Sequence, residues 1–230
     1  MTIDKIYYIN LDRREDRNKH FLEQCEKHSI PQEMIERFSA IDGSTYNFSE
    51  EELNLFTMDV KRCRNNKALI GNQLSHYYIM KEMIEKEYSN ILICQDDVVF
   101  CKQFLKNMNI LGEYITNEFD IVNIGLHKMA IGKTSIPIEL DNCRDYEAKM
   151  CSKAINGCIG VLRYSINPCS LAYVITLQGA KNYIEYFNKN KFNGPTDHCM
   201  NHYLMTRNIF YASRKILATG NPSLGSDIFT

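Results

Sequence analysis

Short apolar runs alternate with segments of helical periodicity along most of the chain. Residues 6–11, 91–94 and 171–175 are largely apolar or aromatic stretches of the length that buried strands use. Residues 38–41 and 120–125 have the same character and are predicted as two further strands. Strands that alternate with helices are typical of an α/β domain with a largely parallel sheet, so the pattern predicts this fold class.

Capping signals and apolar stripes place the predicted helices between these strands. Asp12 with Glu15 has the character of a capping box for the first helix. Ser49 with Glu52 predicts a second helix that runs to about Lys61. The remaining helices are expected from apolar side chains at helical spacing. They are a long helix that starts at Gly71 and carries Leu74, Tyr77, Ile84 and Tyr88, a helix with Phe104, Met108, Leu111 and Ile115, one that follows Thr176, and one opened by Pro195, Thr196 and Asp197.

Periodicity of both kinds fails between residues 126 and 156, which are predicted to form a long irregular connection. Connections of this length are usually functional loops. Residues 220–230, with Pro222 and Gly225, are expected to be a surface segment. The chain has no internal repeat, no linker-like change in composition and no low-complexity tract, so a single domain over residues 1–230 is predicted.

The composition is that of a folded and nearly neutral protein. The chain has 230 residues, 44% of them apolar, which is enough for one well-buried core. Lys and Arg number 27 against 28 for Asp and Glu, and this formal net charge of -1 gives no sign of a nucleic-acid partner. No apolar stretch approaches the roughly 20 residues of a membrane span, so no transmembrane segment is expected.

The cysteines and the first residues bear on the compartment. Nine cysteines without a C-x-x-C pair favour buried, reduced thiols over a disulfide framework or a cysteine zinc site. Residues 1–5 do not resemble the start of a secretory signal. We therefore expect a cytoplasmic protein, either free or peripheral to a membrane.

Two adjacent carboxylates follow the predicted strand at 91–94. Asp96 and Asp97 come at its carboxyl end, where open α/β sheets bind their ligands. Adjacent like charges repel, and a divalent cation with phosphate ligands would relieve that repulsion. The pair therefore indicates a metal–diphosphate site. The alternative is a pair of solvated turn residues, which is common after strands.

A cluster of charges covers the end of the first predicted strand and the first turn of the next helix. Arg13, Arg14 and Arg17 could bind phosphate there through guanidinium contacts and the helix dipole. The alternative is a charged first turn with internal salt bridges. Neither a G-x-G-x-x-G nor a G-x-x-x-x-G-K sequence is present, which argues against dinucleotide-binding and P-loop enzymes.

Two histidine patterns predict no chemistry by themselves. Ser75 and His76 are adjacent in a predicted helix and point about 100° apart, so they cannot form a catalytic dyad. His198 and His202 lie four residues apart, but the Glu that follows the first histidine of a zinc-protease helix is Cys199 here. We interpret these two histidines as ordinary helix residues.

Several motifs occur together in a fixed order over residues 5 to about 228. They are residues 9–14 with Asp16 and Arg17, residues 39–43, Gly71 with residues 74–76, residues 91–97, residues 171–175 with Gly179 and Ala180, and residues 195–197. This set resembles glycosyltransferase family 25, which contains lipopolysaccharide-type galactosyltransferases and the collagen hydroxylysine galactosyltransferases. The resemblance implies a GT-A fold with a Rossmann-like, mostly parallel central sheet, a UDP-sugar donor, a divalent cation that is usually manganese, and inversion at the anomeric carbon. The acceptor would be a hydroxyl of a glycan or of hydroxylysine.

The resemblance also implies roles for individual residues. Asp97 and Asp96 match a DXD-like motif and are the expected metal ligands, with Asp96 also placed beside the ribose or the sugar. Asp197 is the candidate base that accepts the proton of the acceptor hydroxyl. The residues expected to bind the nucleotide-sugar are Asn10, Asp12, Arg13 and Arg17 at its nucleotide end, and Asp42, Ser75 and His76 around the donor.

Three positions depart from the usual pattern of this family. Gln95 stands where a glutamate usually precedes the two aspartates, Asn72 replaces a cysteine, and Met80 replaces a frequent tryptophan. The change at Gln95 removes one carboxylate from the expected metal site. Two hypotheses therefore remain: a UDP-sugar-dependent hexosyltransferase that transfers galactose or glucose, and an inactive nucleotide-sugar-binding or scaffold protein that retains the fold.

Overall fold

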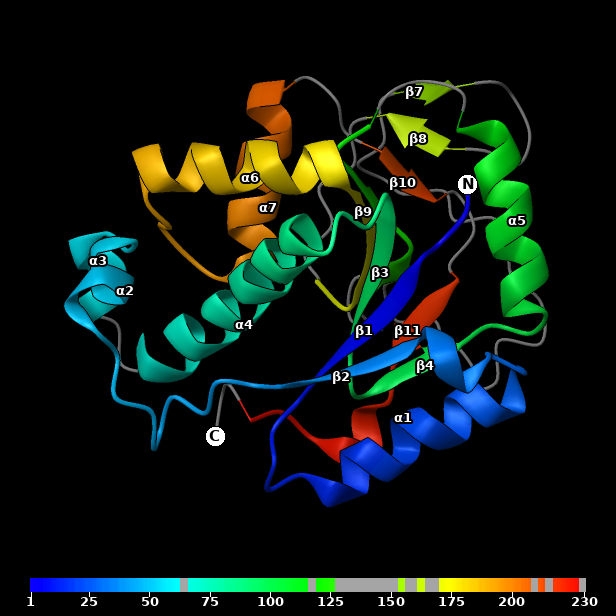
Figure 1. The fold of residues 1–230 in the computed structure, drawn as a ribbon, viewed down its shortest axis with the longest axis horizontal. Helices are drawn as coiled ribbons and strands as arrows, with labels where there is room; N and C mark the ends of the chain where they lie inside the picture. Colours follow the sequence, from blue (N-terminus) through cyan, green and yellow to red (C-terminus); the bar gives the residue numbers. More distant parts are fainter. Residues whose placement is uncertain are drawn as a thin grey trace.

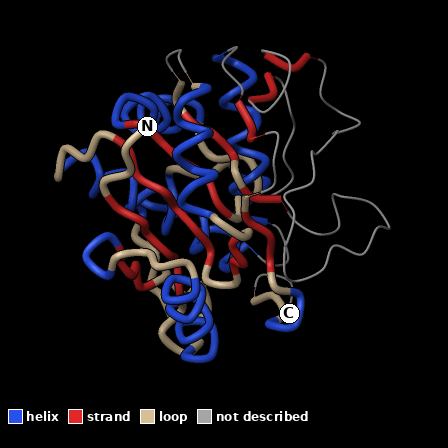
Figure 2. The backbone as a smooth tube through the Cα atoms, turned by 90° about the vertical axis from the view of Figure 1, so that its right-hand side faces the viewer, coloured by secondary structure: helices blue, strands red, loops and turns tan. Residues whose placement is uncertain are grey.

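The centre of the structure is a twisted sheet with helices on both faces (Figures 1 and 2). The computed structural model describes residues 1–62, 66–115, 119–126, 153–155, 161–163, 170–207, 211–213 and 217–227. Eight strands form the main sheet in the order β2-β1-β3-β9-β5-β10-β8-β7. Their bounds are β1 Lys5–Asn10, β2 Ile35–Ser39, β3 Asn90–Gln95, β5 Ile121–Asn123, β7 Lys153–Ile155, β8 Val161–Arg163, β9 Ala172–Thr176 and β10 Tyr211–Ser213.

Most strands of this sheet run in one direction, which confirms the predicted α/β class. β1 pairs in parallel with β2 and with β3, and β5 pairs in parallel with β10. β9 and β8 are antiparallel to both of their neighbours, so the sheet is mixed where the sequence predicts a mostly parallel one. The described helix α5 (Phe104–Tyr114) precedes β5.

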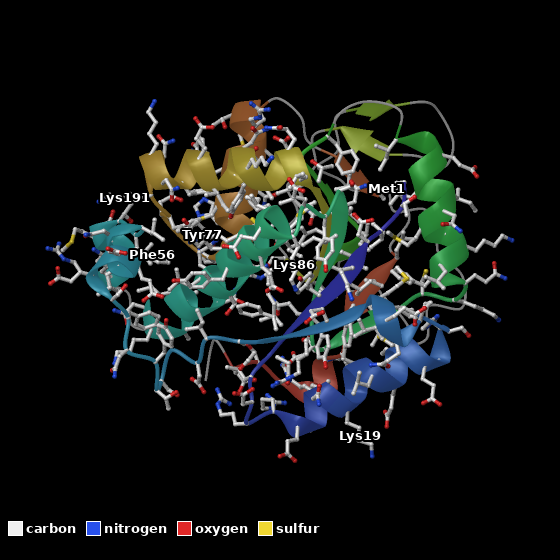
Figure 3. The ribbon with its side chains drawn as sticks, in the orientation of Figure 1. Met1, Lys19, Phe56, Tyr77, Lys86 and Lys191 are labelled. Atoms are coloured by element: carbon white, nitrogen blue, oxygen red, sulfur yellow. The ribbon has the colours of Figure 1, made fainter. Side chains whose placement is uncertain are left out.

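The helices pack in two layers that bury both faces of the sheet. Ile6 and Tyr8 of β1 lie in the core beneath α1 and α5, whereas Tyr7 and Ile9 lie in the core beneath α4, α6 and α7. Successive side chains of a strand point to opposite faces, so this alternation is the expected one for a strand that is buried on both sides. Figure 3 shows Tyr77 of α4 among the side chains of the core beneath α4, α6 and α7. The remaining bounds are α1 Glu15–Lys27, α2 Glu50–Asn54, α3 Met58–Arg62, α4 Asn66–Glu85, α6 Leu177–Asn190 and α7 Thr196–Arg207, with 3₁₀ turns at Gln32–Met34 and Pro222–Leu224.

A second sheet of three strands lies on the α1 side, and the sequence pattern does not predict it. It contains β4 (Val98–Phe100), β11 (Ala218–Gly220) and β6 (Gly125–Leu126), with β11 in the middle. β11 is antiparallel to β4, and the Asn221 N–H donates to the Asp97 carbonyl at 2.8 Å. This pairing brings the residues after 217 next to the turn that follows β3.

The predicted elements are present, but several boundaries differ. The first helix begins at Glu15 without a side-chain cap, so the predicted capping box at Asp12 is wrong. Asp12 instead accepts hydrogen bonds from Arg37 and Ser39 of β2. The capping box of Ser49 with Glu52 is confirmed.

The second and third predicted helices are also bounded differently. The helix after Ser49 ends at Asn54, because a bridge between Phe56 and Phe192 interrupts it before α3 begins. The long helix begins at Asn66, about one turn before the predicted start at Gly71.

Two further predictions are changed in part. The strand expected at 38–41 occupies residues 35–39. Most of the predicted irregular connection, residues 127–152 and 156, lies outside the described residues, whereas Lys153–Ile155 is a strand. Within the described residues, no helix combines the length and the apolar composition that a membrane crossing requires.

Candidate active site

The carboxyl ends of β1 and β3 open onto a cavity of about 450 Å³. The chain leaves β1 for β2 on one side and reaches β3 on the other, so this edge is a point where the strand order reverses. Such points are where open α/β sheets bind ligands. The predicted site residues that line the cavity are Arg13, Arg17, Asp42, Ser75, Asp96, Asp97 and Asp197.

A buried hydrogen-bonded triad lies at the base of the charged wall. Arg17 Nη1 donates to Asp96 Oδ1 at 2.7 Å, and Asn10 Nδ2 donates to Asp96 Oδ2 at 2.8 Å. All three residues are buried, with 4% of Asp96 exposed. Both carboxylate oxygens of Asp96 therefore have protein donors. We assign Asp96 to the positioning of Arg17 and Asn10, which differs from its predicted role as a metal ligand.

Arg13 lies at the rim of the cavity between two carboxylates. Its Nε donates to Asp42 at 2.8 Å and its Nη1 donates to Asp227 at 2.7 Å. Burial raises the pKa of Asp42, but hydrogen bonds from Ser44 and Arg13 outweigh it and lower that pKa below its ordinary value. Asp42 is therefore ionised at neutral pH and holds the Arg13 guanidinium in place.

Asp227 is a residue of this site that the sequence pattern did not predict. Besides its bond with Arg13, its carboxylate accepts a hydrogen bond from Arg14 and lies 3.9 Å from Arg17 Nε. Burial raises the pKa of Asp227, but the hydrogen bond from Arg13 and the charges of Arg14 and Arg17 lower it overall. The predicted surface segment at 220–230 is thus partly a wall of the cavity.

Ser75 joins α4 to the loop after β2. Its hydroxyl donates to the Gly71 carbonyl at 2.8 Å and accepts from the Ile41 N–H at 2.9 Å. A Cβ on Gly71 would lie 2.3 Å from the Ile41 carbonyl oxygen, so only glycine permits this approach. Ser75 lines the cavity as predicted, and it also fixes the loop that carries Asp42.

His76 and Asp12 do not line the cavity. His76 is fully buried, its ring stacks on Tyr173, and its Nδ1 lies 2.8 Å from the Tyr173 hydroxyl. Burial lowers the pKa of His76 to about 3, so the ring is neutral. Asp12 is exposed beside Arg37, whose hydrogen bond lowers the pKa of Asp12. The contacts that the structure shows for both side chains are therefore within the protein, apart from the cavity.

Asp197 lines the cavity from the first turn of α7. Its Oδ1 accepts a hydrogen bond from the N–H of His198 at 2.8 Å. The preceding residue, Thr196, is buried and accepts a hydrogen bond from Asn72 of α4 at 3.0 Å. The two helices therefore fix the backbone that carries Asp197. His198 and His202 are exposed and lie outside the cavity lining, in accord with their interpretation as ordinary helix residues.

The carboxylates of the cavity fit a cation only in part. Asp42, Asp96, Asp97, Asp197 and Asp227 outnumber the lining arginines, so the cavity is acidic in the absence of a ligand. The described residues contain no group of three or more His, Cys, Asp or Glu side chains arranged to hold a metal ion. Magnesium-like cations often use one or two carboxylates and complete their shell with substrate phosphates and water. Asp97 can serve as such a carboxylate, so the residues fit a cation that is held jointly with a phosphate ligand.

Fold and cavity together define an α/β domain with a charged cavity at the carboxyl ends of β1 and β3. The sequence model of glycosyltransferase family 25, described as an LPS biosynthesis protein, matches residues 3–200. The chain belongs to this family.

Some of the curated relatives are named as enzymes and others as inactive family members. The chain is 28% identical over 190 residues to human procollagen galactosyltransferase 2, an alignment that covers 79% of this chain and 27% of the relative. It is 25% identical over 189 residues to a glycosyltransferase 25 family member of Drosophila melanogaster, with 78% and 27% covered. It is 23% identical over 187 residues to inactive glycosyltransferase 25 family member 3 of Mus musculus, with 79% and 28% covered. The chain thus spans a little over a quarter of the length of these relatives.

Among solved structures, the chain is similar to a glycosyltransferase involved in the glycosylation of the major capsid of PBCV-1. The TM-score is 0.48 and the sequence identity is 11%. The superposition covers 99% of this chain and 95% of that structure.

Proposed function

We propose that this domain is a metal-assisted, inverting glycosyltransferase that moves a hexose, galactose or glucose, from a UDP-sugar to a hydroxyl of a glycan or a hydroxylysine-type acceptor. The observation that carries the proposal is that Arg13, Arg17, Asp97 and Asp197 line one cavity at the edge of the sheet. Membership of glycosyltransferase family 25 supports the reaction class, and the names of the procollagen galactosyltransferases support the choice of sugar and acceptor.

The donor would bind between the charged wall and an apolar wall. Guanidinium groups form strong, often bidentate contacts with phosphate oxygens, which suits Arg13 and Arg17 to the diphosphate. Ile41 and Leu69 line the cavity beside the loop after β2 and would pack against the base. The volume of about 450 Å³ falls within the range of small-molecule sites.

Asp97 is the residue that would hold the cation. A divalent cation at this position would neutralise charge on the diphosphate leaving group as the glycosidic bond breaks. The acidity of the cavity supports this assignment, because five lining aspartates would repel an uncompensated diphosphate. Asp96 keeps the Arg17 guanidinium oriented toward the same diphosphate.

Asp197 is placed to act as the base. In an inverting transfer the acceptor hydroxyl attacks the face of the sugar opposite the leaving group. Asp197 comes from α7, which packs on one face of the sheet, whereas Arg17 lies in the first turn of α1, and Arg13 just before that helix, on the other face. The sugar would then lie between the base and the diphosphate. Asp197 would accept the proton of the acceptor hydroxyl during attack.

Release of UDP from a panel of UDP-sugars, with manganese and with EDTA, tests this function. We expect release with at least one sugar, its loss in EDTA, and its loss in Asp97→Ala. Asp59→Ala is the matched control, because Asp59 is exposed on α3 and outside the cavity. Donor hydrolysis and transfer are then separated by adding glycan or hydroxylysine-containing peptides.

A scaffold protein that binds the donor without turnover is the second candidate. Gln95 supports it, because this neutral amide lines the cavity beside Asp96 and its Nε2 lies 3.5 Å from Ser170 Oγ. An inactive relative is also known in the family. Tight UDP binding with no UDP release from any sugar would favour this candidate. Release that appears only in Gln95→Glu would assign the inactivity to the missing carboxylate.

A further inference from the structure

The 221–227 segment places a carboxylate in the middle of the arginine cluster. Asp227 accepts hydrogen bonds from Arg13 at 2.7 Å and from Arg14, and it lies 3.9 Å from Arg17 Nε. Arg13 and Arg17 line the cavity, and Asp227 lines it with them. One side chain from the far end of the sequence thus contacts all three arginines of the β1–α1 turn.

Asp227 uses the donors that an incoming anion needs. Carboxylate and phosphate oxygens bind the same guanidinium N–H groups. Arg13 has its Nε engaged by Asp42 and its Nη1 engaged by Asp227, and Arg17 has its Nη1 engaged by Asp96. Asp42 and Asp96 also line the cavity, and their hydrogen bonds are to Arg13 and Arg17 respectively, whereas Asp227 contacts all three arginines. A diphosphate can pair fully with the cluster only when Asp227 leaves it.

The attachments of this segment to the cavity are largely polar. Arg14 donates to the Leu224 carbonyl at 2.8 Å, and Arg17 donates to the Gly225 carbonyl. Residues 222, 223, 225 and 226 are exposed. Gly225 has a φ of 72°, in the left-handed region that favours glycine, and a Cβ there would meet nothing within 4 Å. Residue 221 is thus held by the Asp97 carbonyl, whereas residues 224, 225 and 227 are held by Arg13, Arg14 and Arg17.

We propose that Asp227 is a built-in competitor for the arginine cluster, so that binding of a diphosphate displaces its carboxylate and loosens the 221–227 segment. This inference rests on the proposed function in taking a diphosphate as the incoming anion. The arginines stay neutralised during the exchange, because the diphosphate takes the place of the Asp227 carboxylate beside the same guanidinium groups. It also makes entry to the cavity depend on the anionic part of the ligand.

Isothermal titration of the full chain with inorganic pyrophosphate tests the competition. Asp227→Asn keeps the shape of the side chain and removes its charge, and Asp59→Asn on the exposed face of α3 is the matched control. We expect pyrophosphate to bind Asp227→Asn about 2- to 5-fold more tightly than the unsubstituted protein, the range of a partly exposed ion pair. The control should bind unchanged. Equal or weaker binding by Asp227→Asn would overturn the proposal.

Hydrogen exchange on the unsubstituted protein gives a readout that does not depend on a variant. Saturating pyrophosphate should increase exchange in peptides that cover residues 217–227, because the arginine contacts are lost. Decreased exchange would show that the segment clamps the ligand and would overturn the proposal. A titration with UDP separates the two ideas. If pyrophosphate binds more tightly to Asp227→Asn but UDP does not bind, the proposed function alone is contradicted. If UDP binds with the same affinity to Asp227→Asn and to the unsubstituted protein, the competition alone is contradicted.

Discussion

Arg17 and Asp96 form a buried ion pair, with 2.7 Å between Arg17 Nη1 and Asp96 Oδ1, although 79 residues separate them in the sequence. The side chains are 8% and 6% exposed. A pair in this environment joins α1 to the turn after β3 and fixes the charged wall of the cavity. Because removal of one partner leaves the other charge buried, the pair is sensitive to single substitutions.

Replacement of Asp96 by alanine should therefore destabilise the fold. We expect Asp96→Ala to lower the free energy of unfolding by about 3 kcal/mol, as for other broken buried pairs. Urea denaturation followed by circular dichroism measures this change. Asp16→Ala is the control, since Asp16 is an exposed partner of Arg14, and it should leave the midpoint unchanged. Equal midpoints for the two variants would contradict the assignment of Asp96 as a positioning residue.

Burial of the neutral His76 ring should make stability depend on pH. Its pKa of about 3 in the fold lies below the ordinary value of 6.5, so the unfolded chain binds a proton that the folded chain does not. Stability is then full above pH 6.5 and falls as the pH drops toward 3. Between pH 7.5 and 5 the loss from this group alone should be about 2 kcal/mol.

A His76→Gln variant isolates this contribution. Glutamine does not titrate, so the variant should lose about 2 kcal/mol less than the unsubstituted protein over the same pH interval. Urea denaturation at pH 7.5 and pH 5 gives the change in unfolding free energy for each protein. Comparing these two changes removes any loss of stability that the substitution causes equally at both pH values. The same pH dependence in both proteins would mean that the pKa of His76 in the fold is close to its ordinary value.

The sequence predicts those parts of the site that depend on local signals. Apolar runs locate β1 and β3, and ligands bind outside the carboxyl ends of such strands, so Arg13, Arg17 and Asp97 are found without long-range information. His76 shows where this reasoning stops. Adjacent residues of a helix point about 100° apart, so when Ser75 faces the cavity His76 turns into the core against Tyr173.

Long-range pairing accounts for the residues that were missed. Asp227 reaches the arginines because β11 pairs with β4, and strands of three residues give little signal in a sequence. The same limit applies to β9, whose apolar run predicts a strand but not its antiparallel direction. Asp12 was assigned to the cavity by its place in a motif, whereas contacts with β2 turn it away.

The close approach of α4 to the loop after β2 should be sensitive to a single methyl group. In Gly71→Ala the new Cβ would lie 2.3 Å from the Ile41 carbonyl oxygen, so backbone must shift where Asp42 and Arg13 meet. We expect a loss of about 1 to 3 kcal/mol in the free energy of unfolding, the range for overpacking, and weaker UDP binding. Gly194→Ala is the control, because its Cβ would first meet the exposed side chain of His198, which can turn away.

The result for Gly71→Ala also bears on the loop itself. Thermal unfolding and UDP titration should both respond, since the loop is part of the fold and of the cavity wall. A variant that is as stable as the control and binds UDP normally would show that the loop moves away from α4 without cost.

Asp197 gives the prediction that bears most directly on the chemistry. If it accepts the proton of the acceptor hydroxyl, Asp197→Asn should lower kcat by about 10² to 10⁴, the usual contribution of a general base. Its carboxylate already accepts the N–H of His198, and an asparagine oxygen can accept the same bond, so α7 should begin unchanged. UDP affinity should also stay the same, because the arginines and Asp97 are untouched. Loss of UDP binding in parallel with loss of turnover would instead place Asp197 among the residues that hold the donor.

The Asn72–Thr196 hydrogen bond supplies the comparison that separates proton transfer from positioning. Asn72→Ala should release the start of α7 and leave the Asp197 carboxylate present but less well placed. A fall in kcat that is smaller than in Asp197→Asn, with the pH dependence of the rate retained, is the expected result. An Asp197→Asn enzyme that keeps both its rate and its pH dependence would show that the proton leaves the acceptor by another route. Another residue that lines the cavity would then be the base.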